Sequence, residues 1–311
     1  MAFRYLGSSL LVLLVVFPLT GCLFRSRIVE RQVSTAPLKA ATQAELIHYI
    51  TDQAAKIQSM QATVDIDASS GGEKKGEITD YKEIRGYVLA RKPAMLRMIG
   101  LLPIVRNKAF DMVSDGKNFK LWIPPKNRFV EGRNDVSTPN INQPLENLRP
   151  QHIYDALLVR EIDPQNEKAV LESGVEQVNG PKGRRYDQPD YEIDVIRKKS
   201  NSDDWYLSRK IIFSRTDLLP HRQIIYDEDG NPETDARYEA YKDYNGVKFP
   251  TQIEIKRPQE EYDITLNIVK LQLNEALTNE QFQLEQPAGA QVIHLDRPQT
   301  SRIHTQQAEA K

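Results

Sequence analysis

Most of this 311-residue chain consists of short stretches in which apolar and polar residues alternate. Between Tyr81 and Val269 such stretches follow one another, and several are separated by the turn dipeptides Asp115-Gly116, Asp229-Gly230 and Asn245-Gly246. Alternation at a period of two places the apolar side chains on one face of a β-strand. Asp-Gly and Asn-Gly are the strongest short-range signals for a hairpin. The pattern therefore predicts a succession of antiparallel strands joined by short turns.

Two stretches have helical spacing instead. Thr42-Gln43-Ala44-Glu45 has the form of a capping box, in which the first and fourth side chains satisfy free backbone N–H groups at a helix start. The apolar residues that follow recur every three or four positions, so we expect an amphipathic helix over 43–58 with one narrow apolar stripe. A second, short helix is expected from Pro150, which fits the first position of a helix.

Many strands in one sheet tend to curl, because curling removes exposed edges. We therefore expect a mainly β domain with minor α over residues 42–290. It would be a single strongly curved antiparallel sheet, or incomplete β-barrel, of about 10–12 strands with a helical lid. Residues 132–149 are expected to form a loop, 167–178 two brief strands, and 291–311 a disordered tail.

The N-terminus has the form of a secretory signal. Arg4 precedes an apolar run from Leu10 to Phe17, and no acidic residue occurs before Glu30. A positive start, an apolar segment of about 7–15 residues and small residues before a cut site define a signal peptide. The run leads into Leu19-Thr20-Gly21-Cys22, and Cys22 is the only cysteine of the chain. A single cysteine cannot form an internal disulfide.

Leu19-Thr20-Gly21-Cys22 resembles the lipobox of bacterial lipoproteins, which has the form Leu-x-Gly/Ala-Cys. The resemblance implies that residues 1–21 are removed, that Cys22 is lipidated and acylated, for example with palmitate, and that 22–41 form a tether. It also implies a place in the bacterial envelope, and Leu23, where an acidic residue would retain the protein in the inner membrane, favours the outer membrane facing the periplasm. The alternative is an uncleaved membrane helix over Tyr5 to Phe24, which reaches the roughly 20 residues of a span only by including glycines and a proline.

The charge balance argues against a nucleic-acid binder. The chain has 42 Lys and Arg against 43 Asp and Glu, and loss of residues 1–21 removes only Arg4, so the remainder carries 41 minus 43, or −2. Nucleic-acid binders show a basic excess.

The order of several short segments resembles the LolA/LolB family of lipoprotein carriers and receptors. The matching pieces are the helix leading into Ile57-Gln58-Ser59-Met60-Gln61-Ala62, then Gly86–Pro93 with Leu96-Arg97, Ser114–Lys117 with Leu121–Pro125, and Gly246–Pro250. The resemblance covers residues 44–290 and implies a half-barrel whose interior holds acyl chains. Implied partners are a lipoprotein or lipid cargo and a soluble periplasmic carrier. The chain departs from LolB in its enlarged middle, from Gly132 to Asn201.

One connection between strands is apolar where polar turn residues are usual. It runs over Gly100–Val105, and its candidate membrane- or cargo-contacting residues are Leu101, Leu102, Ile104 and Val105, with Arg97, Arg106 and Lys108 as basic neighbours. An apolar tip with basic neighbours suits contact with an anionic membrane surface. In LolB, an apolar loop in the corresponding region is used in inserting cargo. The alternative is that this loop folds back into the core.

The inward side chains of the strands would line the interior. The candidates are Val64, Ile66, Val88, Phe110, Leu121, Ile253 and Leu266. The alternative is a filled core, which is usual for an apolar strand face.

Signals for catalysis or metal binding are weak. The histidines form no metal-binding spacing, and the chain contains neither Gly-x-Ser-x-Gly nor a phosphate loop; they are His48, His152, His221, His294 and His304. We expect no enzyme, no cofactor and a monomer. Two hypotheses remain: a lipid-anchored carrier of acyl chains, favoured by a cavity continuous with the apolar loop, and a structural or assembly lipoprotein, favoured by a filled interior.

Overall fold

The structure is a computed structural model that describes residues 36–135, 148–179, 185–199 and 202–295. By contact, the chain divides into a larger unit, residues 36–176 and 189–311, and a smaller unit, residues 1–35 and 177–188. In the smaller unit the described residues are 177–179 and 185–188, where Gln177 Nε2 donates to Asp187 Oδ1 at 3.4 Å. The expected signal peptide, Cys22 and most of the expected tether lie outside the described residues.

Strands make up most of the described chain, as the sequence predicts. In chain order they are β1 (Ser59–Gly72), β2 (Glu77–Asp80), β3 (Ile84–Arg91), β4 (Met95–Leu101), β5 (Lys108–Ser114), β6 (Asn118–Ile123), β7 (Arg128–Arg133), β8 (Glu167–Asn179), β9 (Arg185–Lys198), β10 (Trp205–Ser214), β11 (Pro220–Tyr226), β12 (Pro232–Tyr244), β13 (Val247–Arg257), β14 (Tyr262–Leu273) and β15 (Gln291–His294). The helices are α2 (Gln43–Lys56) and α3 (Pro150–Leu157), with 3-10 turns η2 (Pro124–Lys126) and η5 (Asn279–Phe282). Among these described elements, neither helix combines the length and the apolar character that a membrane crossing requires.

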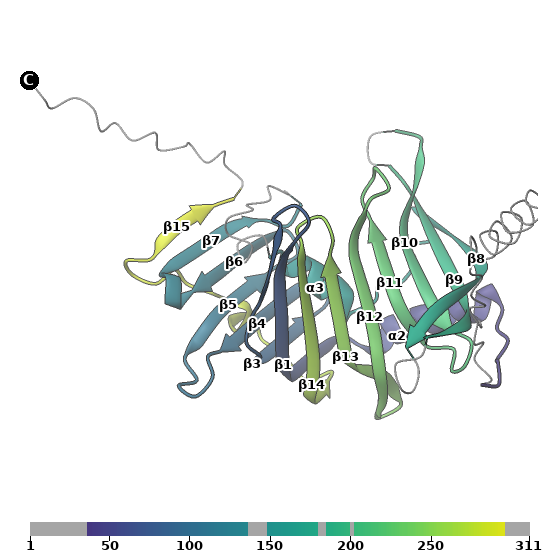
Figure 1. The fold of residues 1–311 in the computed structure, drawn as a ribbon, viewed down its shortest axis with the longest axis horizontal. Helices are drawn as coiled ribbons and strands as arrows, with labels where there is room; N and C mark the ends of the chain where they lie inside the picture. The colour runs from purple at the N-terminus through teal and green to yellow at the C-terminus, as the bar shows by residue number, and fades with distance from the viewer. Residues whose placement is uncertain (1–35, 136–147, 180–184, 200–201, 296–311) are drawn as a thin grey trace, which may run out of the picture. The chain divides into compact units, whose positions relative to one another are not determined.

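The strands form one curved sheet that does not close into a barrel (Figure 1). Its order is β15-β7-β6-β5-β4-β3-β1-β14-β13-β12-β11-β10-β9-β8, with β2 paired to β1. The sheet thus consists of two meanders, β3–β7 and β8–β14, joined by β1 between β3 and β14. The only parallel pairing recorded among the described strands is that of β15 with β7. The expectation of a single, strongly curved, antiparallel sheet is confirmed.

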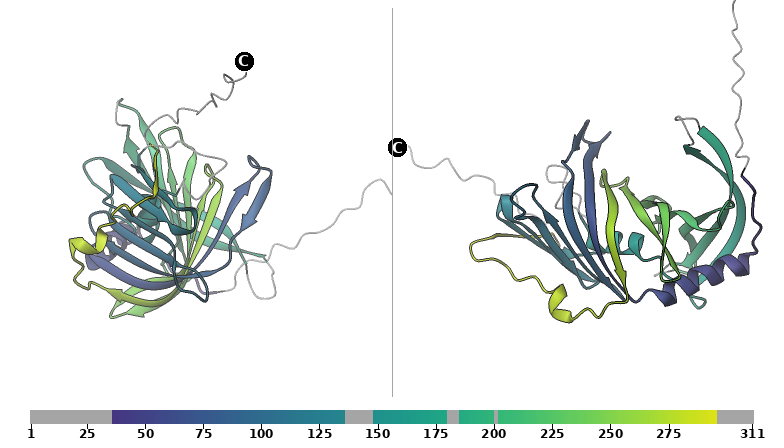
Figure 2. Two further views of the ribbon diagram at one scale, coloured as in Figure 1. Left: turned by 90° about the vertical axis from the view of Figure 1, so that its left-hand side faces the viewer. Right: turned by 90° about the horizontal axis from the view of Figure 1, so that it is seen from below.

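Register places the core on one face of this sheet. Ile211 pairs with Gln223, Gln223 with Ala236, Ala236 with Ile255, and Ile255 with Ile264. Directly paired residues point to the same side of a sheet, so these five side chains share a face. Both helices pack on that face, which is the concave one (Figure 2).

Helix α2 forms where its capping signals predict. The Thr42 backbone N–H donates to Glu45 Oε2 at 2.7 Å, and the Glu45 N–H donates to Thr42 Oγ1 at 3.3 Å. Its buried stripe is Leu46, Ile50 and Ala54, and Leu46 and Ile50 share a core cluster with side chains of β9 and β10.

Helix α3 is embedded in the main core. Its residues Ile153, Ala156 and Leu157 are at most 4% exposed. Two tyrosine hydroxyls fix it: Tyr154 donates to Pro93 O at 2.8 Å, and Tyr238 donates to Ala156 O at 2.9 Å. Because α3 occupies the concave face, it decides how much of the interior is filled.

Several expectations need correction. Residues 167–178 are not two brief strands, because they lie in the single strand β8. Residues 291–294 do not belong to a disordered tail: they form β15, and Leu295 is buried with its N–H bonded to Glu131 O at 3.0 Å. The sheet has 15 strands instead of about 10–12, and β2 and β15 are two strands that the sequence did not indicate. Leu101 ends β4 and does not belong to the loop.

Candidate functional site

A cavity of about 330 Å³ lies between the concave face of the sheet and the start of α3. It is at the end of the sheet where β1, β4 and β6 finish and β3, β5 and β14 begin. Most of its lining is apolar, including Ile66, Met98, Met112, Ile123 and Ile153. Ligand pockets in proteins measure about 300–1,000 Å³, so this cavity is large enough for a small apolar ligand.

Polar groups gather at one place in this lining. Ser70, Tyr81, Lys82 and Tyr262 all border the cavity. The hydroxyls of Ser70 and Tyr81 lie 3.1 Å apart, and the Tyr81 N–H donates to Ala68 O at 2.9 Å. Ser70 is buried, whereas Tyr81 is 37% exposed and Lys82 is exposed. The cavity therefore has an apolar body and a polar border that reaches the surface.

The seven candidate lumen residues divide into two groups. Ile66, Phe110 and Leu121 line the cavity. The others are at most 1% exposed in the same core cluster but do not reach the cavity; they are Val64, Val88, Ile253 and Leu266. That cluster also contains Ile153, Ala156 and Leu157 of α3. Helix α3 thus fills much of the interior that the sequence analysis considered available to a ligand. The cavity is the part that α3 does not fill.

The apolar connection after β4 joins this cavity to the surface. Leu102 and Pro103 line the cavity, while Ile104 is 99% and Val105 62% exposed. The connection does not fold back as a whole into the core. Its first part faces the interior and its tip faces outward.

The tip is held in an uncommon turn. The Val105 N–H donates to Pro103 O at 2.8 Å around Ile104, whose φ is +68°. A β-branched residue in the left-handed region is a genuine outlier, and such outliers cluster at functional sites. Further bonds from Leu102 N–H to Asn107 O at 2.7 Å and from Arg106 N–H to Leu102 O at 3.1 Å close the loop. Backbone bonding thus holds an apolar β-branched side chain in water.

The basic neighbours of the loop differ in their pairing. Asp111, with a fully buried side chain, accepts from Arg97 at 2.8 Å and from Lys108 at 2.7 Å. These two cations are therefore engaged. Lys82 and Arg106 are exposed and have no ion-pair partner among the described residues. They are the positive charges available to an anion near the loop.

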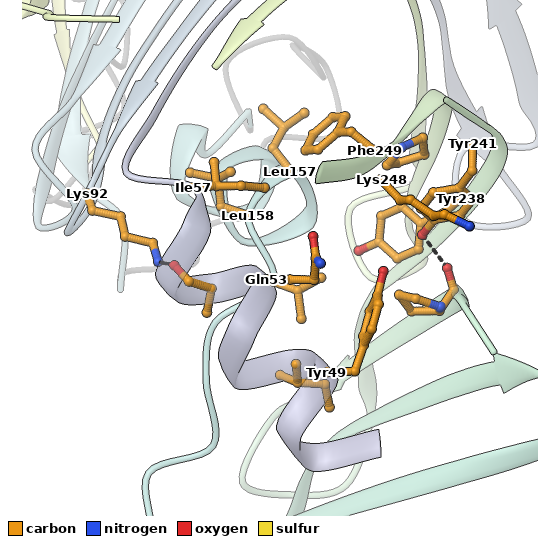
Figure 3. A pocket seen from close by; sticks show the side chains of 15 residues that line it. Tyr49, Gln53, Ile57, Lys92, Leu157, Leu158, Tyr238, Tyr241, Lys248 and Phe249 are labelled. Carbon is orange, nitrogen blue, oxygen red and sulfur yellow. Dashed lines mark hydrogen bonds between the residues drawn. The ribbon is translucent and has the colours of Figure 1, made fainter. Parts of the chain in front are cut away.

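A second cavity, of about 60 Å³, lies at the other end of α3 (Figure 3). Tyr49 and Gln53 of α2, Leu157 of α3, and Tyr238 and Tyr241 of β12 border it. This space is well below the roughly 300–1,000 Å³ of ligand pockets in proteins, so it is too small for an acyl chain. Burial, aided by nearby carboxylates, raises the pKa of Tyr49 to about 12. These phenols therefore stay neutral and act in packing.

The described residues form no metal-binding site. Among them, no group of three or more His, Cys, Asp or Glu side chains is placed to hold a metal ion. His152 is held neutral on α3, because burial and the charges of Arg257 and Arg149 place its pKa well below the usual value.

Sequence reasoning missed part of the site. Met98 and Met112 alternate correctly in their strands, so the period-two pattern could have identified them. Leu148 precedes α3 in a stretch expected to be a loop, and Tyr81 and Lys82 lie in a connection between strands. Connections carry no periodic signal, so nothing local marked these three residues as part of a cavity.

Comparison with known proteins finds distant structural neighbours. No protein-family model matches the chain, and no curated protein matches it. A DUF1329 family protein from Desulfovibrio piger has a TM-score of 0.47 at 15% identity, with 77% of this chain and 95% of that one covered. A LolA superfamily protein from Nitrosomonas europaea has a TM-score of 0.45 at 14% identity, covering 76% of this chain and 97% of that one.

A third neighbour is an outer membrane lipoprotein-sorting protein domain from Vibrio parahaemolyticus. Its TM-score is 0.45 at 16% identity, with 77% of this chain and 94% of that one covered. The neighbours thus include a protein named for the superfamily that the sequence resembles. Because all three TM-scores lie below 0.5, we base the function on the cavity and loop of this chain.

Proposed function

We propose that this protein is a lipid-anchored lipoprotein of the bacterial envelope that binds an acyl chain of a lipoprotein or lipid and takes part in its transfer to the outer membrane. The observation that supports it is the continuity of the apolar cavity with the exposed loop: Leu102 and Pro103 line the cavity, and Ile104 and Val105 follow at the surface. Each methylene that moves from water into such a cavity contributes about 0.8 kcal/mol. No covalent step is required.

Transfer follows from the same geometry. An apolar chain leaving the cavity along Leu102 and Pro103 would reach the loop tip at Ile104 and Val105, which are exposed. If the tip enters a bilayer, the chain passes from one apolar medium to another, and the free-energy difference between the two is small. The anchor on Cys22, where the lipobox places it, would keep the protein at that bilayer.

A second candidate is a structural or assembly lipoprotein with a filled core. It is favoured by Val64, Val88, Ile253 and Leu266, which are packed without space beside α3. In that case the cavity would stay empty in solution.

The two functions are separated by the lipid content of the purified protein. We would express the chain from Leu23 onward, which keeps every described residue, and purify it without detergent for lipid mass spectrometry. Acyl lipid in stoichiometric amount is expected. Ala68→Phe places a ring at a cavity-lining position and should remove that lipid, whereas Val269→Phe, at an exposed position of β14, should not.

A lipid-free protein that also fails to take up a fluorescent fatty acid would contradict the carrier function and favour the scaffold. Thermal unfolding of both variants would show that Ala68→Phe still folds, since overpacking alone costs about 1–3 kcal/mol.

The anchor is tested separately. Cys22→Ser should abolish metabolic labelling of the full chain with radioactive palmitate and shift the protein from the membrane to the soluble fraction. Unchanged labelling would contradict lipidation at Cys22.

A further inference from the structure

The cavity has room for about one acyl chain. An apolar cavity of about 150 Å³ in another protein holds one benzene ring. The space of about 330 Å³ is roughly twice that size, which suits one chain of about a dozen carbons. Two or three long chains do not fit in it together.

The polar border of the cavity is held in place by hydrogen bonds to strand β1. Tyr81 and Lys82 lie in the connection between β2 and β3. The Tyr81 N–H donates to Ala68 O at 2.9 Å, and its hydroxyl lies 3.1 Å from the hydroxyl of Ser70, so this connection is fixed to β1. Lys82 is therefore held beside the cavity by its neighbour, while its own ammonium group has no ion-pair partner among the described residues.

Charges of both signs act near this border. Tyr262 pairs with Ser70 across β14 and β1 and borders the cavity. Burial raises the pKa of Tyr262 to about 12; the charges of Arg257 and Arg149 act against that rise, and the charge of Glu260 adds to it. Both arginines thus act electrostatically at Tyr262, although Glu260 pairs with Arg257 at 2.7 Å.

Among the described residues that line the cavity, the acidic one points elsewhere. Asp263 belongs to the lining, but in β14 it alternates with the buried residues Tyr262 and Ile264. Alternation places its side chain on the opposite face of the sheet, so its carboxylate does not offset Lys82 inside the cavity.

We infer that the ligand is a single-chain amphiphile with an anionic head, a carboxylate or a phosphate, whose chain lies along Met98, Phe110 and Ile153 and whose head is bound by Lys82 and the hydroxyls of Tyr81 and Ser70. This inference rests on the proposed function, because it assigns the polar end of the acyl ligand. It excludes the simultaneous binding of all chains of a fully acylated lipoprotein.

The test compares ligands that share a chain and differ in charge. The full chain is kept in digitonin, which carries no alkyl chain, and is titrated with radiolabelled dodecanoate, dodecyl phosphate and the neutral dodecanol at low salt. Lys82→Met removes one charge at the cavity border. Lys242→Met removes one from an exposed position of β12 outside the lining and is the matched control.

For Lys82→Met we expect about fivefold weaker binding of dodecanoate and of dodecyl phosphate, the size usual for one exposed charge pair, and less than a twofold change for dodecanol. The fivefold effect should shrink at high salt, because exposed charges are screened. Lys242→Met should bind all three ligands as the unaltered chain does. Each ligand partitions into the detergent to the same extent whichever variant is present. The ratios of dissociation constants between variants therefore report on the protein.

Each other outcome is informative. If the unaltered chain binds all three ligands and Lys82→Met changes none of them, the anionic head is wrong while the proposed function stands. If the unaltered chain binds neither dodecanol nor dodecanoate, the proposed function itself fails. Within the inference, tighter binding of dodecyl phosphate would identify a single-chain lysophospholipid as the source of the head, and tighter binding of dodecanoate a free fatty acid.

Discussion

At the scale of single residues, Glu167 shows how this protein tolerates buried charge. Its side chain is fully buried, and its carboxylate lies 2.6 Å from Arg160, 2.7 Å from Arg197 and 3.4 Å from Arg209, which is itself 2% exposed. The Asp163 N–H donates to it at 3.0 Å. Burial opposes ionisation, but these partners prevail and lower the pKa of Glu167. The carboxylate is therefore ionised at neutral pH and balances the arginines.

Glu167→Gln keeps the size of the side chain and removes its charge. We expect a loss of about 3–5 kcal/mol in the free energy of unfolding at pH 7, because Arg209 is left buried without a counter-charge. Urea denaturation measures it. Glu172→Gln, at an exposed position of the same strand, should cost less than about 0.5 kcal/mol. Equal effects of the two substitutions would show that the arginine cluster is not stabilised by Glu167.

Asp190 is the opposite case, a buried carboxyl without adequate partners. It is 3% exposed, and its Oδ1 atom has no hydrogen-bond partner in the described structure. Burial, followed by the charges of Glu192 and Glu176, raises its pKa from 3.8 to about 6. The folded state thus holds this proton more tightly than the unfolded state. Stability from this group is complete below about pH 4 and is lost as the pH rises through 6.

Asp190→Asn should remove that pH dependence. At pH 7.5 we expect the variant to be about 2 kcal/mol more stable than the unaltered chain, and the difference should vanish near pH 4. Denaturation curves from pH 4 to 8 give the comparison, with the exposed Asp203→Asn as the control. A variant that is less stable at pH 7.5 would mean that the charge of Asp190 is needed.

At the scale of the element, α2 illustrates a helix specified by its first turn. Thr42 and Glu45 satisfy each other's backbone N–H groups, and Leu46 and Ile50 are then aligned on the core. Thr42→Ala should cost about 1 kcal/mol of unfolding free energy, because one N-terminal N–H loses its acceptor. Thr51→Ala, on the exposed side of the same helix, should be neutral or slightly stabilising. A comparable loss in both variants would argue against the cap as the cause.

At the scale of the whole molecule, the exposed tip of the loop is expected to bind membranes on its own. Ile104→Asp should weaken binding of the chain from Leu23 onward to vesicles rich in phosphatidylglycerol at least about tenfold, since burial of an isoleucine side chain contributes about 2 kcal/mol. Co-sedimentation measures this without the anchor. Val269→Asp alters another exposed aliphatic residue and should leave binding unchanged. If both variants bind as before, the loop does not enter the bilayer.

The sequence predicts those parts of the molecule that have local signals. Helix α2, the hairpin turn at Asp115-Gly116 and most strands follow from capping residues, Asn-Gly or Asp-Gly dipeptides and alternation. Residues 167–178 were expected to form two brief strands, but they lie in the single strand β8, which contains Gly174. In the sheet, Gly174 is a close-packing position, where an added Cβ would lie 2.5 Å from Asp190 Oδ1.

The cavity itself has no local signal. Alternation identifies the face on which Val64 and Ile66 lie, but Ile66 lines the cavity and Val64 does not. The difference depends on how deeply α3 sits on the sheet, which is set by contacts such as that of Tyr238 with Ala156. These contacts join residues far apart in the chain and leave no periodic trace.

The pairing of β1 with β14 also determines the order in which the chain can fold. Each meander is made of hairpins between neighbouring segments, which close quickly because little chain entropy is lost. The seam between the meanders joins Met60 to Leu273, and β15 reaches back from Gln291 to Arg128. During synthesis from the N-terminus, β1 can pair with β3 and β7 with β6, but the other edge of each strand stays without its partner until almost the whole chain has been made. Two open strand edges therefore persist until late in synthesis, and in that interval the protein is most exposed to edge-to-edge association with other chains.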